Sequence, residues 1–161
     1  MKELILAMML WIHNATGYII PEAPNVKYLS TMDLRSYAYG CNLKPIPKYN
    51  KEICDSRENW DIDNRGPLAL YDHIDKLIIL NKDFDITTVH DKSVLLHELV
   101  HHLQYHNGID STVNCQAELE KEAYNLQDEW LQEKHNVTVW DTIHLNRLFY
   151  MVITNCDRIG Y

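Results

Sequence analysis

The chain has 161 residues, of which 46% are hydrophobic and 24% are charged. This balance argues against a disordered chain and supplies enough apolar side chains for a core, so we expect one compact domain over residues 1–161. The formal net charge of −8, with no basic run, disfavours a nucleic-acid partner, because binding to phosphates requires positive charge.

An amphipathic helix is predicted at the N-terminus, where Leu4, Met8 and Trp11 share one face and Gly17 ends the pattern. Its apolar run, LILAMMLWI at residues 4–12, is too short to cross a bilayer as a helix. No small-x-small cleavage site follows the run, so a secretory signal peptide is not indicated. We therefore expect no membrane partner, and the sequence leaves both a cytoplasmic location and export after processing open.

The middle of the chain predicts short strands around a polar loop. Residues 26–30 alternate as a strand, and residues 31–40 are helix-like. Residues 41–66 are rich in Pro, Asn and Asp, which is typical of a surface loop. Two β-like runs, PLALY at 67–71 and KLIIL at 76–80, are separated by DHID and predict a β-hairpin.

Three helices are predicted after the hairpin. Asp91 is the expected N-cap of the first helix, which ends at residues 107–108; the second covers about 114–135 and the third 141–160. The third helix is expected to bury an apolar face formed by Leu145, Leu148, Phe149, Val152 and Cys156. The order of helix, short strands and three helices predicts an α+β fold.

The four cysteines form no CxxC pair, so a closed cysteine zinc site is not indicated. Cys41 and Cys54 flank a loop that a disulfide could close. Cys115 and Cys156 fall on the apolar faces of predicted helices, and we interpret them as buried thiols. The even count is compatible with an oxidising compartment without requiring one.

The helix predicted after Asp91 contains the motif HELVH, in which His97, Glu98 and His101 are the polar residues. Residues four apart lie one above the other on a helix, so the two imidazoles can bind one tetrahedral ion. Glu98, on the neighbouring flank, can hydrogen-bond a water at that ion and act as general base. Aliphatic residues surround all three, and burial of ionisable groups there requires compensation. The sequence therefore predicts a Zn²⁺ site with His97 and His101 as ligands.

A third ligand must come from elsewhere, because catalytic zinc sites usually have three protein ligands. Gln104 and Asn107 occupy the positions where the longer HExxHxxGxxH motif has Gly and His. The next helix offers three glutamates. Measured around the helix axis from Leu119, on its apolar face, Glu122 lies at about −60°, Glu118 at about −100° and Glu120 at about +100°. We predict Glu122 as the third ligand, Glu118 as an alternative ligand or an outer partner, and Glu120 as solvent-facing.

Four segments carry a resemblance to known proteins: WIHNATGYIIPEAP at 11–24, LYD at 70–72, HELVHHLQ at 97–104 and EAYNLQ at 122–127. The chain resembles zincin metallopeptidases of the gluzincin type, in which a glutamate helix follows the HExxH helix. It is also similar to an uncharacterised bacterial family of small zincin-like proteins. EAYNLQ is similar to the EAN segment that supplies the glutamate ligand in small peptidases regulating stress and mobile-element responses, although Tyr124 replaces the Asn. The resemblance implies a minimal zincin fold, with an edge strand along the substrate cleft above the HExxH helix.

These features predict zinc-dependent hydrolysis of peptide bonds, with a peptide or protein as substrate and Glu98 as general base. The substrate backbone is expected to pair with the hairpin edge at residues 76–80. Tyr105 and His144 are both candidates for stabilising the oxyanion. The alternative is a catalytically silent zinc-binding module, regulatory or protein-binding, on the same fold. A third interpretation treats the motif as a coincidence in a helical structural protein.

Overall fold

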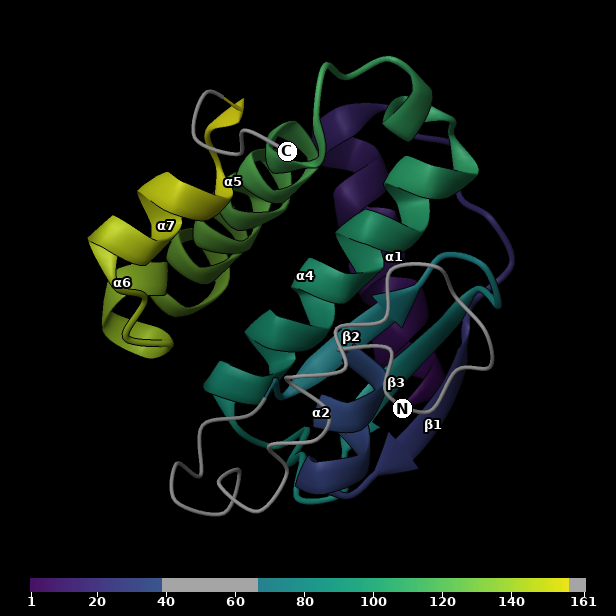
Figure 1. Cartoon of the computed structure of the whole chain (residues 1–161), viewed down its shortest axis with the longest axis vertical. Helices are drawn as coiled ribbons and strands as arrows, with labels where there is room; N and C mark the ends of the chain where they lie inside the picture. Colours follow the sequence, from purple (N-terminus) through teal and green to yellow (C-terminus); the bar gives the residue numbers. More distant parts are fainter. Residues whose placement is uncertain (39–66, 157–161) are drawn as a thin grey trace. The chain divides into compact units, whose positions relative to one another are not determined.

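A computed structural model describes residues 1–38 and 67–156 of the chain (Figure 1). By its contacts the chain divides into two compact units, one made of Met1–Pro24 with Asp85–Tyr161 and the other of Asn25–Phe84. The predicted polar loop at 41–66 and the predicted Cys41–Cys54 disulfide lie outside the described residues. In the part of the chain that is described, no helix has both the length and the apolar character needed to cross a membrane.

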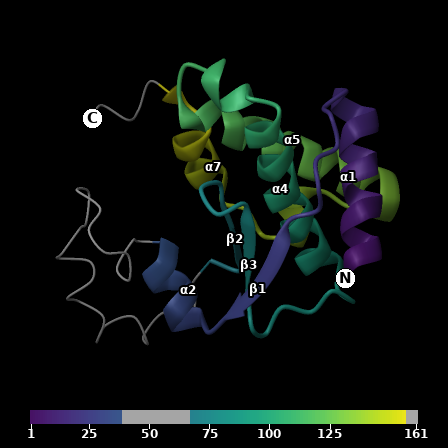
Figure 2. The ribbon, with the colours of Figure 1, turned by 90° about the vertical axis from the view of Figure 1, so that its right-hand side faces the viewer.

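The unit formed by Asn25–Phe84 contains a three-stranded sheet and one described helix (Figure 2). Its elements are β1 (Asn25–Leu29), α2 (Thr31–Ala38), β2 (Ala69–Asp72) and β3 (Leu77–Asn81). β2 and β3 pair antiparallel, which confirms the predicted hairpin, and β1 pairs parallel with β3. Helix α2 contacts all three strands, and its Leu34 is fully buried.

β3 is the middle strand of this sheet, in the order β1-β3-β2. Its residues Ile78, Ile79 and Leu80 are fully buried, and Ile78 is paired with Val26 on one side and Tyr71 on the other. The backbone of β3 is therefore hydrogen-bonded along both edges. The prediction that a substrate pairs with the edge at residues 76–80 is wrong, because β1 takes that position.

The other unit is helical. Its described elements are α1 (Lys2–Thr16), α4 (Val89–His106), a short 3₁₀ turn (Ile109–Ser111), α5 (Gln116–His135), α6 (Val139–Thr142) and α7 (Arg147–Ile153). α4 and α5 lie side by side and form the main helix pair of the unit (Figure 1). Together with the sheet of the Asn25–Phe84 unit, these helices confirm the α+β class.

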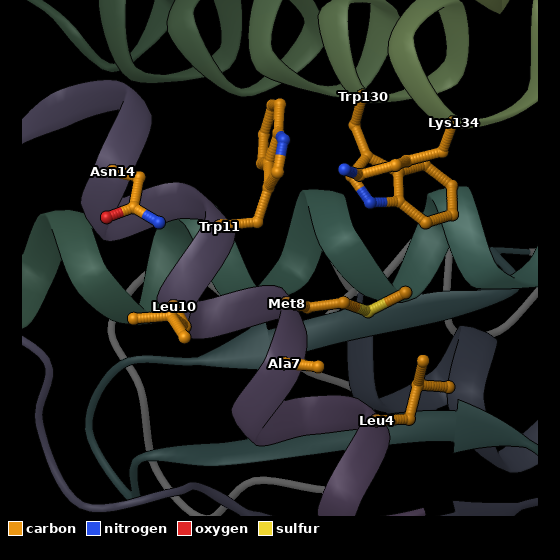
Figure 3. A pocket seen from close by; sticks show the side chains of 8 residues that line it. All are labelled: Leu4, Ala7, Met8, Leu10, Trp11, Asn14, Trp130 and Lys134. Carbon is orange, nitrogen blue, oxygen red and sulfur yellow. The ribbon is translucent and has the colours of Figure 1, made fainter.

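Helix α1 ends where the sequence predicts, because Gly17 adopts the left-handed conformation with φ of 78°. Its buried face consists of Ile5, Met8, Met9 and Ile12. Leu4, Met8 and Trp11 share one face as predicted, and this face lines an open groove of about 420 Å³ (Figure 3). Trp130 of α5 lines the same groove, and the Trp11 Nε1 donates to Glu133 at 2.8 Å.

Helix α4 has the predicted extent but a different N-cap. Thr88 is the N-cap, and its Oγ1 accepts from the backbone N of Asp91 at 3.1 Å. Asp91 lies in the first turn, where its carboxylate accepts from the backbone N of Asp85 at 2.7 Å. The helix ends at the C-cap Asn107, and Gly108 follows with φ of 70°.

The predicted third helix over 141–160 is interrupted. His144 adopts φ of 49° between α6 and α7, and Asn146 caps α7 by accepting from the backbone N of Leu148 at 2.8 Å. The predicted apolar face is not buried, because Leu148 is 64% exposed and Phe149 54% exposed. A disulfide joins Cys115, just before α5, to Cys156 after α7, so the interpretation of these two residues as buried thiols is wrong.

Candidate metal centre

The middle of α4 carries the HELVH motif on its packed face. His97 and Glu98 are each 8% exposed, and their aliphatic neighbours Leu96, Leu99 and Val100 are fully buried. Three ionisable residues in such an environment are costly unless hydrogen bonds or a bound ion compensate for the lost hydration. The geometry around these residues supplies that compensation from α5.

A carboxylate of α5 completes a group that could hold a metal ion. His97, His101 and Glu120 each offer one ligand atom, and these atoms all lie within 4.8 Å of one another. The two Nε2 atoms are 3.2 Å apart. Glu120 places one carboxylate oxygen 3.3 Å from the His97 Nε2 and the other 3.4 Å from the His101 Nε2. Both histidines therefore turn the same ring nitrogen toward a single carboxylate.

The glutamates of α5 occupy other positions than the sequence predicted. Glu120, expected to face solvent, has a side chain only 36% exposed and lies against both imidazoles. Glu122, expected as the third ligand, instead accepts from the Tyr18 hydroxyl at 2.7 and 2.8 Å and from Gln104 Nε2 at 2.7 Å. Glu118, the alternative, accepts from Asn114 at 2.8 Å. The structure thus brings Glu120, and not Glu122 or Glu118, to the two histidines.

Glu122 contributes to the centre indirectly, through Gln104. The Gln104 amide nitrogen donates to Glu122 and, at 3.0 Å, to the Leu119 carbonyl, so its Oε1 must face the other way. That oxygen lies 2.8 Å from the His101 Nδ1 and accepts a hydrogen bond from its N–H. With Nδ1 protonated, the Nε2 of neutral His101 carries the lone pair that a metal ligand needs.

A second chain of hydrogen bonds fixes His97 in the same way. Ser93 Oγ donates to the His90 carbonyl at 2.7 Å, and Gln127 Nε2 donates to Ser93 Oγ at 3.1 Å. The Gln127 Oε1 is thereby left to accept from the His97 Nδ1, which lies 3.2 Å away. In their neutral form, both imidazoles thus leave Nε2 unprotonated. Outer hydrogen-bond partners fix the ligating histidines of metal sites in the same way.

The charges of the group stabilise one another. Burial favours the neutral form of Glu120, but hydrogen bonds and charge from His101 and His97 outweigh it and hold the pKa of Glu120 well below its usual range. For His101, burial lowers the pKa, yet the hydrogen bond and charge of Glu120, aided by the charge of Glu98, raise it overall. The centre therefore attracts positive charge, whether that charge is a proton or a cation.

Two further side chains border the centre. Glu98 is near enough for its charge to act on His101 and on Tyr124. The Tyr124 ring lies against the His97 ring, with centroids 4.4 Å apart. The two residues that the sequence suggested for oxyanion stabilisation have other surroundings. The Tyr105 hydroxyl accepts from Gln116 Nε2 at 3.2 Å, and His144 is exposed between α6 and α7.

The residues that the sequence analysis missed share one flank of α5. Glu120, Tyr124 and Gln127 are spaced four and three apart, so they lie on the same side of the helix. Each of them contacts His97. A polar flank with this spacing, next to the apolar face of α5, was the signal available in the sequence.

Comparison with known proteins identifies the chain at the level of a family. No curated protein and no solved structure matches it significantly. Residues 48–157 match a family described as a domain of unknown function, DUF6647, and this match covers both helices of the candidate metal centre. Because the matched region is more than half of the 161 residues, the chain belongs to the DUF6647 family.

Proposed function

We propose that the chain is a zinc-dependent metallopeptidase in which His97, His101 and Glu120 hold the metal and Glu98 is the general base. The spacing of the ligand atoms carries this proposal. Zinc bonds of 2.0–2.1 Å in tetrahedral geometry require ligand atoms about 3.3 Å apart. The two Nε2 atoms lie 3.2 Å apart, close to this spacing. The two oxygens of the Glu120 carboxylate face them, one at 3.3 Å from the His97 Nε2 and the other at 3.4 Å from the His101 Nε2.

The type of ligand favours zinc over harder cations. Ca²⁺ and Mg²⁺ prefer sites made of oxygen atoms, whereas imidazole nitrogen suits zinc and its neighbours among the transition metals. Two histidines and one glutamate form a ligand set of catalytic zinc sites, which have three protein ligands. The proposal keeps the helix order of the gluzincin resemblance and assigns the glutamate to position 120 instead of 122.

Glu98 is assigned the proton transfers of peptide hydrolysis. A zinc ion bound here would act as a Lewis acid that lowers the pKa of a water and polarises the carbonyl of the scissile peptide bond. Glu98 accepts a proton from the attacking water while the water oxygen bonds to the carbonyl carbon. It then returns that proton to the amine nitrogen as the C–N bond breaks. Gln104 and Gln127 hold the imidazoles in position throughout, because their amides are fixed by further hydrogen bonds.

The first test measures zinc content and cleavage for the full chain and for Glu98→Gln. We expect one zinc per chain in both proteins, because Glu98 is not a ligand, and cleavage of a peptide library by the wild-type protein alone. The variant should lose at least about a hundredfold in rate, the typical contribution of a general base. Absence of zinc from the wild-type protein would reject the metal site.

The same experiment separates the enzyme from its rival. A wild-type protein that binds stoichiometric zinc but cleaves no peptide, with Glu98→Gln behaving identically, would contradict the peptidase. It would favour the catalytically silent zinc-binding module, whose partners would have to be found by binding and not by turnover.

A further inference from the structure

Tyr124 lies one turn after Glu120 on α5 and on the same flank of the helix. Its ring contacts the His97 ring with centroids 4.4 Å apart and an interplanar angle of 58°. The Tyr150 ring of α7 meets its other side edge-on at 5.7 Å. The phenol is thus held between a residue of the metal centre and a neighbouring helix, which restricts its orientation.

The Tyr124 hydroxyl has no partner in the described part of the protein. Among residues 1–38 and 67–156, no hydrogen bond joins it to a side chain or to the backbone. In the same residues, no buried side-chain oxygen or nitrogen lacks a hydrogen bond. The Tyr124 oxygen is therefore not a fully buried atom, although the residue itself is partly buried. Tyr18 differs, since its hydroxyl is bound by Glu122.

The surroundings of the phenol keep its proton in place. Burial raises the pKa of Tyr124 above its ordinary value, and the charges of Glu120 and Glu98 raise it further. A tyrosine with its ordinary pKa of about 10 is already protonated at neutral pH, so the phenol can donate a hydrogen bond without any shift. Its O–H has no acceptor in the described part of the protein.

We infer that Tyr124 donates a hydrogen bond to the carbonyl oxygen of the scissile peptide bond as that oxygen becomes negatively charged. The inference rests on the proposed peptidase function. When water attacks the carbonyl carbon, the π electrons move to the carbonyl oxygen, and Glu98 takes the water proton. Tyr124 keeps its own proton and only donates the hydrogen bond. When the C–N bond breaks, the carbonyl re-forms and the leaving nitrogen receives its proton from Glu98. A donor already in place stabilises this charge without reorganisation.

The test compares the zinc-loaded full chain with Tyr124→Phe, which keeps the ring and removes only the hydroxyl. With the peptide that the wild-type protein cleaves fastest, kcat should fall about a hundredfold while KM changes less than about threefold. Zinc affinity, measured by competition with a chelator, should stay within about twofold of wild type, because the phenol is not a ligand. Tyr150→Phe is the matched control, since the Tyr150 hydroxyl is directed to Asn125.

A second measurement does not depend on turnover. Acetohydroxamate binds metal centres through oxygen atoms that can accept the same hydrogen bond, and its binding to cobalt-loaded protein is visible in the absorption spectrum. Tyr124→Phe should weaken acetohydroxamate binding about tenfold, the typical effect of one hydrogen bond to a charged acceptor. Tyr150→Phe should not.

Two results would overturn the inference. One is an unchanged kcat together with unchanged acetohydroxamate binding in Tyr124→Phe. The other is a loss of activity matched by an equal loss of zinc affinity, which would assign Tyr124 to packing against His97. If the wild-type protein cleaves no peptide at all, the proposed function fails and this inference fails with it; the acetohydroxamate titration then reports only whether Tyr124 donates a hydrogen bond to an oxygen ligand at the metal.

Discussion

At the scale of single residues, the candidate metal centre depends on two glutamines as much as on its proposed ligands. Gln104 and Gln127 each accept a hydrogen bond from an Nδ1 atom, and each donates from its own amide nitrogen to other groups. This arrangement selects the imidazole tautomer before any ion binds. A preformed geometry lowers the entropic cost of assembling a metal site.

Glu120, the proposed third ligand, is predicted to be indispensable for metal binding. Glu120→Gln keeps the shape of the side chain but removes the charge that faces both histidines. We expect zinc affinity to fall more than about a hundredfold, because even outer partners of ligands contribute about 10- to 100-fold. Chelator competition measures the effect. Glu118→Gln is the control on the same helix and should bind zinc as the wild-type protein does, since Glu118 faces Asn114 and the Cys156 sulfur instead of the histidines.

Glu122 is predicted to act on the metal through Gln104. Glu122→Gln removes the charge that accepts from both Tyr18 and Gln104, so the Gln104 amide loses its fixed orientation. Zinc affinity should drop about 10- to 100-fold, the range for an outer partner, and remain measurable. Isothermal titration of the metal-free protein with zinc tests this. A loss as complete as that of Glu120→Gln would restore Glu122 as a direct ligand.

The sequence could predict the two histidines of the centre but not its glutamate. Spacing within α4 fixes His97 and His101 relative to each other, because both belong to one helix. The third position depends on how α5 lies against α4. The helical wheel identified Glu122 as the glutamate nearest the apolar face, and it is indeed held inside by Tyr18. The histidines meet α5 at the flank of that face, where Glu120 is still partly exposed.

At the scale of the elements, local signals determined the parts that could be predicted. The hairpin follows from alternating strands and a polar turn, and α4 follows from its periodicity and from its stop at Asn107. The C-terminal region follows local signals too, but ones that compete. Its apolar periodicity suggests one long helix, whereas the left-handed His144 and the cap at Asn146 divide it.

The disulfide could not be predicted because it depends on how distant elements pack. Cys115 and Cys156 are 41 residues apart in the chain. They come together because α7 folds back along α5, where Tyr150 meets Tyr124. Spacing alone cannot reveal such a pairing.

Removal of this disulfide is predicted to cost substantial stability. For a loop of 41 residues, the chain-entropy estimate of the stabilisation is about 4 kcal/mol. The double variant Cys115→Ser/Cys156→Ser should therefore lower the free energy of unfolding by roughly that amount in urea titrations under non-reducing conditions. Its refolded form should still bind zinc, because neither residue contacts the centre. A change below about 1 kcal/mol would contradict the entropic account of this crosslink.

At the scale of the whole molecule, the centre joins segments that are far apart in the sequence. Tyr18, just after α1, reaches Glu122 of α5, and the Glu22 carbonyl lies 2.9 Å from the His102 Nε2 of α4. Residues 18–22 thus connect to both helices of the centre. Because the ligands are brought together only in the folded chain, zinc binding should stabilise the fold by mass action.

The stability of the metal-free protein is predicted to depend on pH through His101 and Glu120, whose contributions change in opposite directions as pH rises. The pKa of His101 lies above its ordinary 6.5, so its contribution is complete below pH 6.5 and is lost as pH rises through the raised pKa. The pKa of Glu120 lies below its ordinary 4.5, so its contribution is present above pH 4.5 and is lost as pH falls through the lowered pKa. Stability from this pair should be greatest between pH 4.5 and 6.5.

In the zinc-loaded protein, stability should instead increase as pH rises above 6.5. Zinc binds neutral imidazole and must displace the proton from His101. Below the raised pKa of His101, zinc affinity should increase about tenfold per pH unit, one proton being released for each ion bound. Thermal unfolding of the metal-free and zinc-loaded proteins, followed from pH 6.5 to about pH 8, measures both effects. The gap between the two melting temperatures should widen with pH in the wild-type protein and be absent in Glu120→Gln. A gap that stays constant would mean that no proton leaves His101 when the metal binds, which would contradict either the raised pKa of His101 or its assignment as a ligand.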